Sequence, residues 1–145
     1  MPNRKLTVTH EGQTFTRTTQ RTYTHVVLVK SDYAYAYATG TKGAADCARI
    51  NYPYYVREAN PATRAHNQDA KSIAAYTEIA ALTIDEYAKR VSDVIAAKVD
   101  AMKAAGDFDR FGVFGWSGRL DLAQKEAERA KKHGYKEVVI VPVPV

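Results

Sequence analysis

The chain has 145 residues, 46% of them apolar and 26% charged, a composition that excludes a wholly disordered protein and suits one ordinary globular domain. No run approaches the roughly eighteen consecutive apolar residues of a membrane span, and the first residues lack the apolar segment of a secretory signal, so we expect a cytoplasmic protein with no membrane contact. Lys and Arg outnumber Asp and Glu by 21 to 16, a net charge of +5 that favours acidic partners.

The residues that commonly bind metals are few and scattered. Cys47 is the single cysteine, which excludes an intramolecular disulfide, and no Cys or His spacing suits zinc. His10, His25, His66 and His133 fall on separate predicted elements with no pair four residues apart. We therefore expect no structural metal and no cofactor.

The N-terminal residues predict three strands. Residues 5–10 alternate polar with apolar, and residues 13–19 are rich in β-branched side chains. Glu11-Gly12 between them predicts the turn of an antiparallel hairpin, with Phe15 as its apolar anchor. Residues 24–30 hold four apolar residues in a row, which predicts a strand that is covered on both faces and central to the sheet.

Residues 31–61 differ from the rest because they hold six of the ten tyrosines, mixed with alanine, glycine and proline. Neither the strand period nor the helix period holds over this stretch. We expect an irregular, tyrosine-rich segment in which residues 33–37 form an extended edge and residues 39–43 form a loop.

Two helices are predicted next. Apolar residues recur at helical spacing over 69–82, and Thr83 with Glu86 three residues later is the pattern of a capping box. The second helix should run over 84–105, stop at Gly106 and pack on the sheet through its apolar side.

The chain then predicts a strand over 110–116, a helix over 120–133 and a strand over 137–143. Their connection makes a parallel or near-neighbour placement of these two strands in one sheet plausible. We predict an α+β fold with a mixed, mainly antiparallel sheet of about four to five strands, in the order β-β-β-[α-α]-β-α-β, and with helices packed on one face. We expect residues 1–145 to form a single domain, with 34–105 as a helical or tyrosine-rich insertion.

The turn Gly115-Trp116-Ser117-Gly118-Arg119, between a strand and a helix, is the clearest local motif. Free N–H groups at the start of the helix, beside Arg119, are able to hold a phosphate. The alternative is a tight turn with Trp116 in the core and with Lys125, Arg129 and Lys132 on a solvated helix face. The turn lacks the glycine spacing of a nucleophile elbow, and no acid and base pair accompanies it, so we lean against an enzyme.

A second candidate is the cationic surface of the predicted hairpin and the strand that follows it. Its cations lie among threonines, a mixture that suits phosphate contacts, and stacked tyrosines from the middle segment would add affinity for unpaired bases. The alternative is the ordinary polar outer face of an antiparallel sheet. The cations are Arg4, Lys5, Arg17, Arg21 and Lys30.

Residues 13–27 (Gln-Thr-Phe-Thr-Arg-Thr-Thr-Gln-Arg-Thr-Tyr-Thr-His-Val-Val) and 115–125 (Gly-Trp-Ser-Gly-Arg-Leu-Asp-Leu-Ala-Gln-Lys) resemble segments of small bacteriophage and mobile-element proteins without an assigned activity. The resemblance covers about the first 30 and the last 35 residues. It implies a bacterial cytoplasm and a binder of a host factor or a defence system, including an inhibitor of the anti-CRISPR type. It gives no residue a role.

Three functions follow from these patterns. The first is a small basic binding protein that engages nucleic acid or a host protein that handles nucleic acid. The second is an inhibitor that sequesters a protein partner through the tyrosine-rich segment, because tyrosine is favoured at interface cores. The third, with least support, is an enzyme acting at residues 116–119. The residues predicted to bind are Arg17, Arg21, Lys30, Arg119, Lys125, Arg129, Tyr52, Tyr54 and Tyr55.

Overall fold

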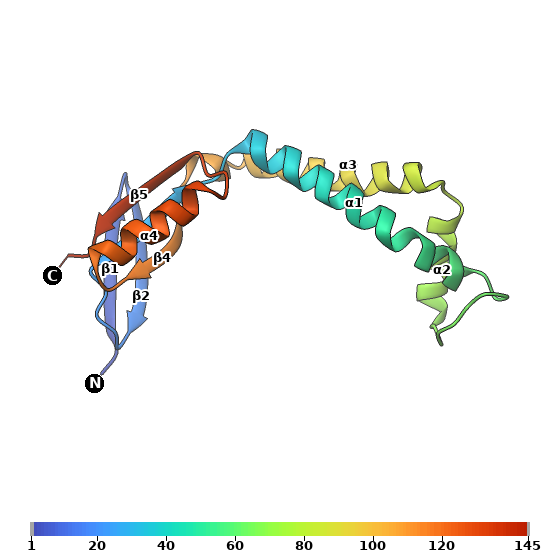
Figure 1. Cartoon of the computed structure of the whole chain (residues 1–145), viewed down its shortest axis with the longest axis horizontal. Coiled ribbons are helices and arrows are strands. Elements are labelled where there is room, and N and C mark those ends of the chain that lie inside the picture. The colour runs from blue at the N-terminus through green and yellow to red at the C-terminus, as the bar shows by residue number, and fades with distance from the viewer. Residues whose placement is uncertain (1, 145) are drawn as a thin grey trace. The chain divides into compact units, whose positions relative to one another are not determined.

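A computed structural model describes residues 2–144 of the chain and shows an α+β fold (Figure 1). The contacts divide the chain into two compact units. The first unit contains the described residues up to Tyr35 and from Met102 onward, and the second is Ala36–Ala101. The second unit falls inside the range 34–105 that we predicted as an insertion; that it is an insertion stays a prediction.

The first unit begins with the predicted hairpin. Strands β1 (Arg4–His10) and β2 (Gln13–Thr19) pair antiparallel, with His10 opposite Gln13. Glu11 and Gly12 both take positive φ, 47° and 77°, which is the conformation of a two-residue type I′ turn and matches the twist of the strands. The hairpin prediction is therefore confirmed.

A three-stranded antiparallel sheet follows, in the order β4-β3-β5. Strand β3 (His25–Lys30) lies between β4 (Gly112–Ser117) and β5 (Glu137–Pro142), so its prediction as the central strand is confirmed. Strands β4 and β5 are near neighbours rather than a hydrogen-bonded pair, because β3 separates them. The single sheet that we expected is divided, with the hairpin forming a two-stranded sheet of its own.

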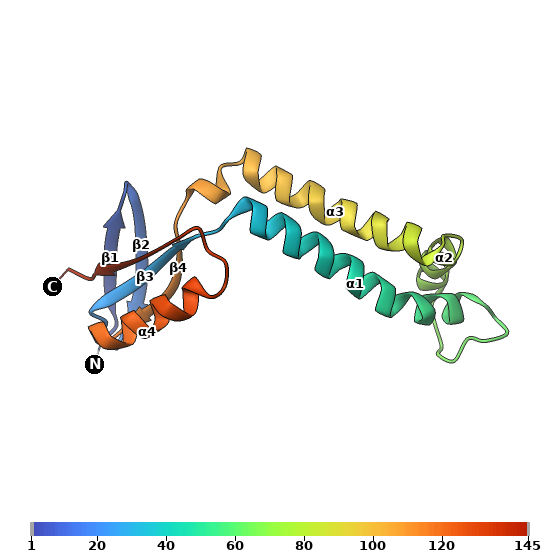
Figure 2. The same cartoon turned by 45° about the horizontal axis from the view of Figure 1, so that its top comes forward.

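The side chains of β3 alternate between two cores. Val26 and Leu28 pack with Val8 of the hairpin, whereas Val27 packs with Ala123 and other residues of helix α4 (Leu120–Lys131). The first unit therefore has three layers, with the hairpin on one face of the three-stranded sheet and α4 on the other (Figure 2). The alanines of α4 let the helix approach the sheet closely.

The tyrosine-rich segment is helical, which corrects our prediction of an irregular segment with an extended edge. Helix α1 runs over Tyr33–Ala59 and includes Pro53. Its less exposed positions recur every three or four residues, and half of them carry Gly or Ala. A search for large apolar residues at helical spacing misses such a stripe, and the exposed Tyr35 and Tyr37 obscure it further. The small residues of the stripe are Ala36, Gly40, Ala44, Ala48 and Ala59.

The two predicted helices are present as α2 (Ala70–Ala80) and α3 (Ile84–Ala104). The capping box is confirmed, because Thr83 N–H donates to Glu86 Oε1 at 3.0 Å and Glu86 N–H donates to Thr83 Oγ1 at 3.1 Å. Gly106, at φ 80°, follows α3 and precedes the short 3₁₀ helix Asp107–Asp109.

The contacts of α3 described within the second unit are with α1 and α2, and our expectation that this helix packs on the sheet stays a prediction. Arg49 of α1 pairs with Asp85 of α3 at 2.5 Å, and Arg90 of α3 pairs with Glu78 of α2 at 2.7 Å. The apolar side of α3 is used between helices, where Ile95 lies against Gly40.

Candidate functional site

The net positive charge of the chain belongs to one of its two units. Lys and Arg outnumber Asp and Glu by thirteen to eight in the first unit and equal them at eight to eight in the second, which accounts for the net +5 of the chain. An acidic partner is therefore attracted to the first unit by net charge, and the second unit adds no such attraction.

A groove at one end of the first unit gathers cationic, hydroxyl and aromatic side chains. It has a volume of about 530 Å³, and no Asp or Glu is found among the described residues that line it. We call it the basic groove; its lining residues are Arg4, Lys5, Leu6, Thr22, Tyr23, Thr24, His25, Pro142, Val143 and Pro144.

Backbone hydrogen bonds fix the floor of the basic groove. Thr24 lies just before β3, and its N–H donates to the carbonyl oxygen of Ser117 at 2.9 Å. On the other side, Val143 N–H donates to the carbonyl oxygen of Thr24 at 2.8 Å. The segment that carries Tyr23 and His25 is thus tied to β4 on one side and to the residue after β5 on the other, which fixes a part of the groove that lies just outside the strands.

Arginines surround this segment. Arg4 Nη2 donates to Thr22 Oγ1 at 3.1 Å and to the carbonyl oxygen of Arg21 at 3.4 Å. The Arg17 guanidinium lies 4.8 Å from the centre of the Tyr23 ring, a cation–π contact that contributes about 0.5–1 kcal/mol at an exposed site. The predicted residues Arg17 and Arg21 therefore lie next to the basic groove.

Arg119 comes from the turn that we predicted as a phosphate site. The turn adjoins the groove, because a Cβ placed on Gly118 would lie 3.3 Å from the carbonyl oxygen of Thr22. Arg119 precedes α4 in extended backbone conformation, and its side chain pairs with Asp121 at 3.3 Å. Trp116 is half-buried against the core between hairpin and sheet. The centres of the Trp116 and Tyr23 rings are 6.2 Å apart.

The other predicted cations lie elsewhere on the first unit. Lys30 is at the far end of β3. Its Nζ lies 3.8 Å from Glu11 Oε2 and 4.6 Å from the centre of the Phe111 ring. Lys125 and Arg129 are exposed on α4, and Arg129 pairs with Glu126 at 2.6 Å. The structure thus brings Arg17, Arg21 and the turn before Arg119 to the groove and leaves these three cations away from it.

The three predicted tyrosines are in the second unit and pack with one another and with their neighbours. Tyr55 stacks on Tyr76 of α2, with the two ring centres 5.2 Å apart. The Tyr52 hydroxyl donates a hydrogen bond to the carbonyl oxygen of Leu82 at 2.5 Å. Burial raises the pKa of Tyr76 and of Tyr87, and the neighbouring tyrosines raise it further, so these phenols stay neutral. All three predicted tyrosines are half-buried.

A buried carboxylate organises the loop after α1. Glu58 is fully buried, and its oxygens accept the N–H groups of Ala65 at 3.1 Å and His66 at 3.2 Å, together with a hydrogen bond to His66 Nδ1. Burial acts to raise the pKa of Glu58, but these hydrogen bonds outweigh burial and hold the pKa at about 2. The loop is further tied by Arg64, whose Nε donates to the carbonyl oxygen of Glu58 at 2.8 Å.

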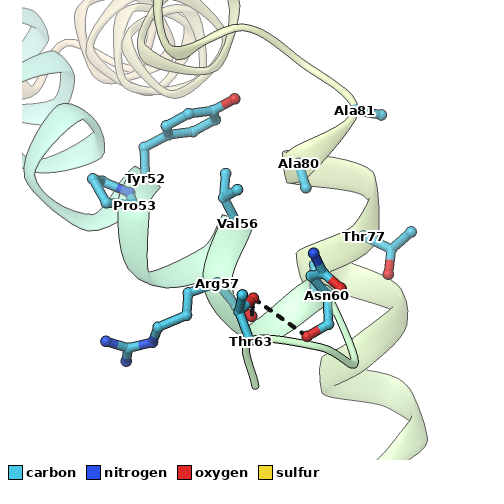
Figure 3. Close-up of a pocket in the computed structure, with 10 residues that line it drawn as sticks. Tyr52, Pro53, Val56, Arg57, Asn60, Thr63, Thr77, Ala80 and Ala81 are labelled. Atoms are coloured by element: carbon cyan, nitrogen blue, oxygen red, sulfur yellow. Dashed lines mark hydrogen bonds between the residues drawn. The ribbon is translucent and has the colours of Figure 1, made fainter. Parts of the chain in front are cut away.

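An open apolar groove of about 820 Å³ lies between the C-terminal half of α1 and α2 (Figure 3). Tyr52 and Val56 project into it from α1, and Ala80 faces them from α2. At its lower end Thr63 Oγ1 donates to the carbonyl oxygen of Arg57 at 2.9 Å, which closes the loop there. Among the described lining residues Arg57 carries the single charge. We call this surface the apolar groove.

Sequence reasoning missed several of these features. Tyr23 and His25 were not singled out, although the run Arg-Thr-Tyr-Thr-His places a ring between hydroxyls and next to cations at a strand start. Glu58 left no signal, because an acidic residue followed by a loop gives no hint that the loop folds back over it. The apolar groove left no sequence pattern either, because its lining joins residues of α1, such as Val56, with residues of α2, such as Ala80.

Comparison of the chain with protein-family models, with curated proteins and with solved structures gave no match. The relationship to bacteriophage proteins therefore stays a prediction. No helix in the described part of the chain has the length and apolar character to cross a bilayer. Within residues 2–144, no group of three or more His, Cys, Asp or Glu side chains is placed to hold a metal ion.

Proposed function

We propose that the protein binds nucleic acid through the basic groove and the arginines next to it. One observation supports this most directly: the lining of the groove combines Arg4 and Lys5 with hydroxyls and an aromatic ring, and it includes no carboxylate among its described residues. Arginine, lysine and threonine side chains are the usual partners of phosphate oxygens.

The electrostatics of the first unit support the same proposal. Surface cations that are paired with carboxylates lose much of their attraction for phosphate, as on the exposed side of α4. Arg4 and Arg17 instead contact neutral groups, Thr22 and the ring of Tyr23, and neither pairs with a carboxylate among the residues that the structure describes. Binding carried by such contacts releases counterions and weakens steeply as salt rises.

The test is fluorescence anisotropy of purified, nuclease-treated protein with labelled oligonucleotides at low and moderate salt. Arg21→Glu should weaken binding and lower the slope of log affinity against log salt by about 1 for each phosphate that the arginine neutralises. Lys71→Glu makes the same charge change on the exposed surface of α2, in the neutral unit, and should leave the affinity nearly unchanged. Absence of binding even at low salt would rule the proposal out.

A second candidate function rests on the apolar groove. The second unit has no net charge and presents an apolar groove beside a tyrosine cluster, features that favour a protein partner. A host protein that handles nucleic acid, or a component of a defence system, is the partner that we propose here. Sequestering such a protein would make the chain an inhibitor.

A pull-down that survives nuclease treatment distinguishes this candidate from the first. Val56→Glu places a charge in the apolar groove and should abolish capture of the partner. Ile50→Glu is the matched control, because Ile50 is on the same helix, is 76% exposed and does not line the groove. Equal capture by the two variants would exclude the groove as the docking site.

A further inference from the structure

The basic groove differs from an ordinary cationic surface in its shape and in its aromatic lining. Its volume of about 530 Å³ lies in the range of about 300–1,000 Å³ that is typical of pockets for small ligands. A pocket of this size takes in one nucleotide unit, whereas a flat patch of cations contacts only a backbone. Tyr23 and His25 place two rings in this lining.

From these features we infer that the basic groove takes an unpaired base against Tyr23 while Arg4 and Lys5 hold the adjoining phosphates, so that the protein selects single-stranded over duplex nucleic acid. This inference rests on the proposed function and specifies its substrate. Bases in a duplex are stacked and paired, so only the phosphates of a duplex could reach the groove. An unpaired base offers its face to an aromatic side chain whatever its identity.

The surroundings of Tyr23 suit this role. The Arg17 guanidinium 4.8 Å from the ring centre and the hydrogen bonds of Thr24 on both sides hold the segment in place. A ring whose position is fixed before binding loses little conformational entropy when a base stacks on it. Thr22 and Thr24 line the same groove, where the Thr22 hydroxyl accepts a hydrogen bond from Arg4 at 3.1 Å and the Thr24 hydroxyl is hydrogen-bonded to His25 Nδ1 at 2.7 Å.

The experiment compares a labelled oligothymidylate with a duplex of equal length, using anisotropy on the full chain. We expect the single strand to bind more tightly, and Tyr23→Ala to weaken its binding roughly tenfold while changing duplex binding little. Tyr23→Phe keeps the ring and should retain the preference. Tyr135→Ala is the matched control, because Tyr135 is a half-buried tyrosine of the same unit that contacts Phe114 and does not line the groove.

A measurement on the unmodified protein tests the inference even if Tyr23→Ala fails to fold. Trp116 is the one tryptophan of the chain and lies 6.2 Å from Tyr23, so its fluorescence reports on the groove. Oligothymidylate should change this fluorescence with the same midpoint as the anisotropy, and the duplex should not.

The outcomes separate the inference from the function on which it rests. Equal affinity for the single strand and the duplex, with the same change in Trp116 fluorescence, would overturn the inference and leave nucleic-acid binding standing. No binding of either probe at low salt would overturn both. Single-strand preference that survives Tyr23→Ala in a folded protein would also overturn the inference, since the ring would then not be its source.

Discussion

Glu58 shows how one side chain can organise a segment that has no regular structure of its own. Its carboxylate is fully buried yet ionised, because backbone N–H groups of Ala65 and His66 replace the water that it loses. The loop between α1 and α2 therefore closes around a charge rather than around an apolar residue. Removal of that charge leaves two buried N–H donors without acceptors of equal strength.

Acid should loosen the second unit through this residue. The pKa of Glu58 is held at about 2 in the folded protein against an ordinary value of 4.5, so its stabilising effect is complete above about pH 4.5 and is lost as pH falls towards 2. Urea denaturation of the wild type, followed by circular dichroism over this window, should show the decline. Glu58→Gln should be less stable at neutral pH and should show a smaller decline.

The control for this prediction is Asp46→Asn, which removes an exposed carboxylate of the same helix that pairs with Lys42 at 2.7 Å. Exposed pairs four residues apart contribute only about 0.3–0.5 kcal/mol, so this variant should follow the wild type. If Glu58→Gln and the wild type lose stability in parallel below pH 4.5, the acid sensitivity comes from other carboxylates.

At the level of single elements, α3 depends on its capping box. Thr83→Ala removes the acceptor of Glu86 N–H, so we expect a loss of about 1 kcal/mol in the free energy of unfolding. Thr83→Ser keeps the hydroxyl and should retain most of the stability. Chemical denaturation measures both variants, and equal stability of Thr83→Ala and Thr83→Ser would show that the cap contributes nothing.

Helix α1 offers a second prediction, because two of its glycines have different surroundings. A Cβ on Gly43 meets no atom within 4 Å, whereas a Cβ on Gly40 would lie 3.2 Å from Ile95 Cγ2. Gly43→Ala should stabilise the protein by roughly 0.4–1 kcal/mol, because alanine lowers the backbone entropy of the unfolded chain. Gly40→Ala should gain less or lose stability, since Ile95 must move. Thermal denaturation that ranks Gly40→Ala above Gly43→Ala would contradict this account.

For the whole molecule, the division into two units separates the two candidate functions. The basic groove is in the first unit with all of the net charge, and the apolar groove is in the neutral second unit. The cores differ as well. The first unit buries four consecutive residues of β3, whereas the buried apolar residues of the second unit are Ala48, Ala88 and Val99 among those described.

Leu28→Ala should reveal this division in hydrogen exchange. Leu28 is completely buried, so its truncation should cost about 2–5 kcal/mol and accelerate exchange in the sheet and α4. Amides of α2 should keep their wild-type rates, since the contacts of Leu28 lie in the first unit. Val113→Ala, at a residue that is 43% exposed in the same sheet, is the control and should change little. Equal acceleration in both units would show that they open together.

The sequence predicted the local elements because their causes are local. Glu11-Gly12 specifies its turn through backbone conformation, residues 13–19 through their β-branched side chains, and Thr83 with Glu86 through hydrogen bonds three residues apart. The four apolar residues of β3 predicted a central strand, because only burial on both faces accommodates them. The α+β class followed from the order of these elements.

Other features were decided only by the tertiary structure. Helix α1 is held by small residues that face its neighbours, as Gly40 faces Ile95, and a stripe of Gly and Ala has little hydrophobic signal of its own. The basic groove joins residues from both ends of the chain, Arg4 and Tyr23 with Pro142, because β3 pairs with both β4 and β5. The pattern of charges along the chain showed which cations exist. Which of them share a groove depends on strand order and register, and these are set by contacts between residues far apart in the sequence.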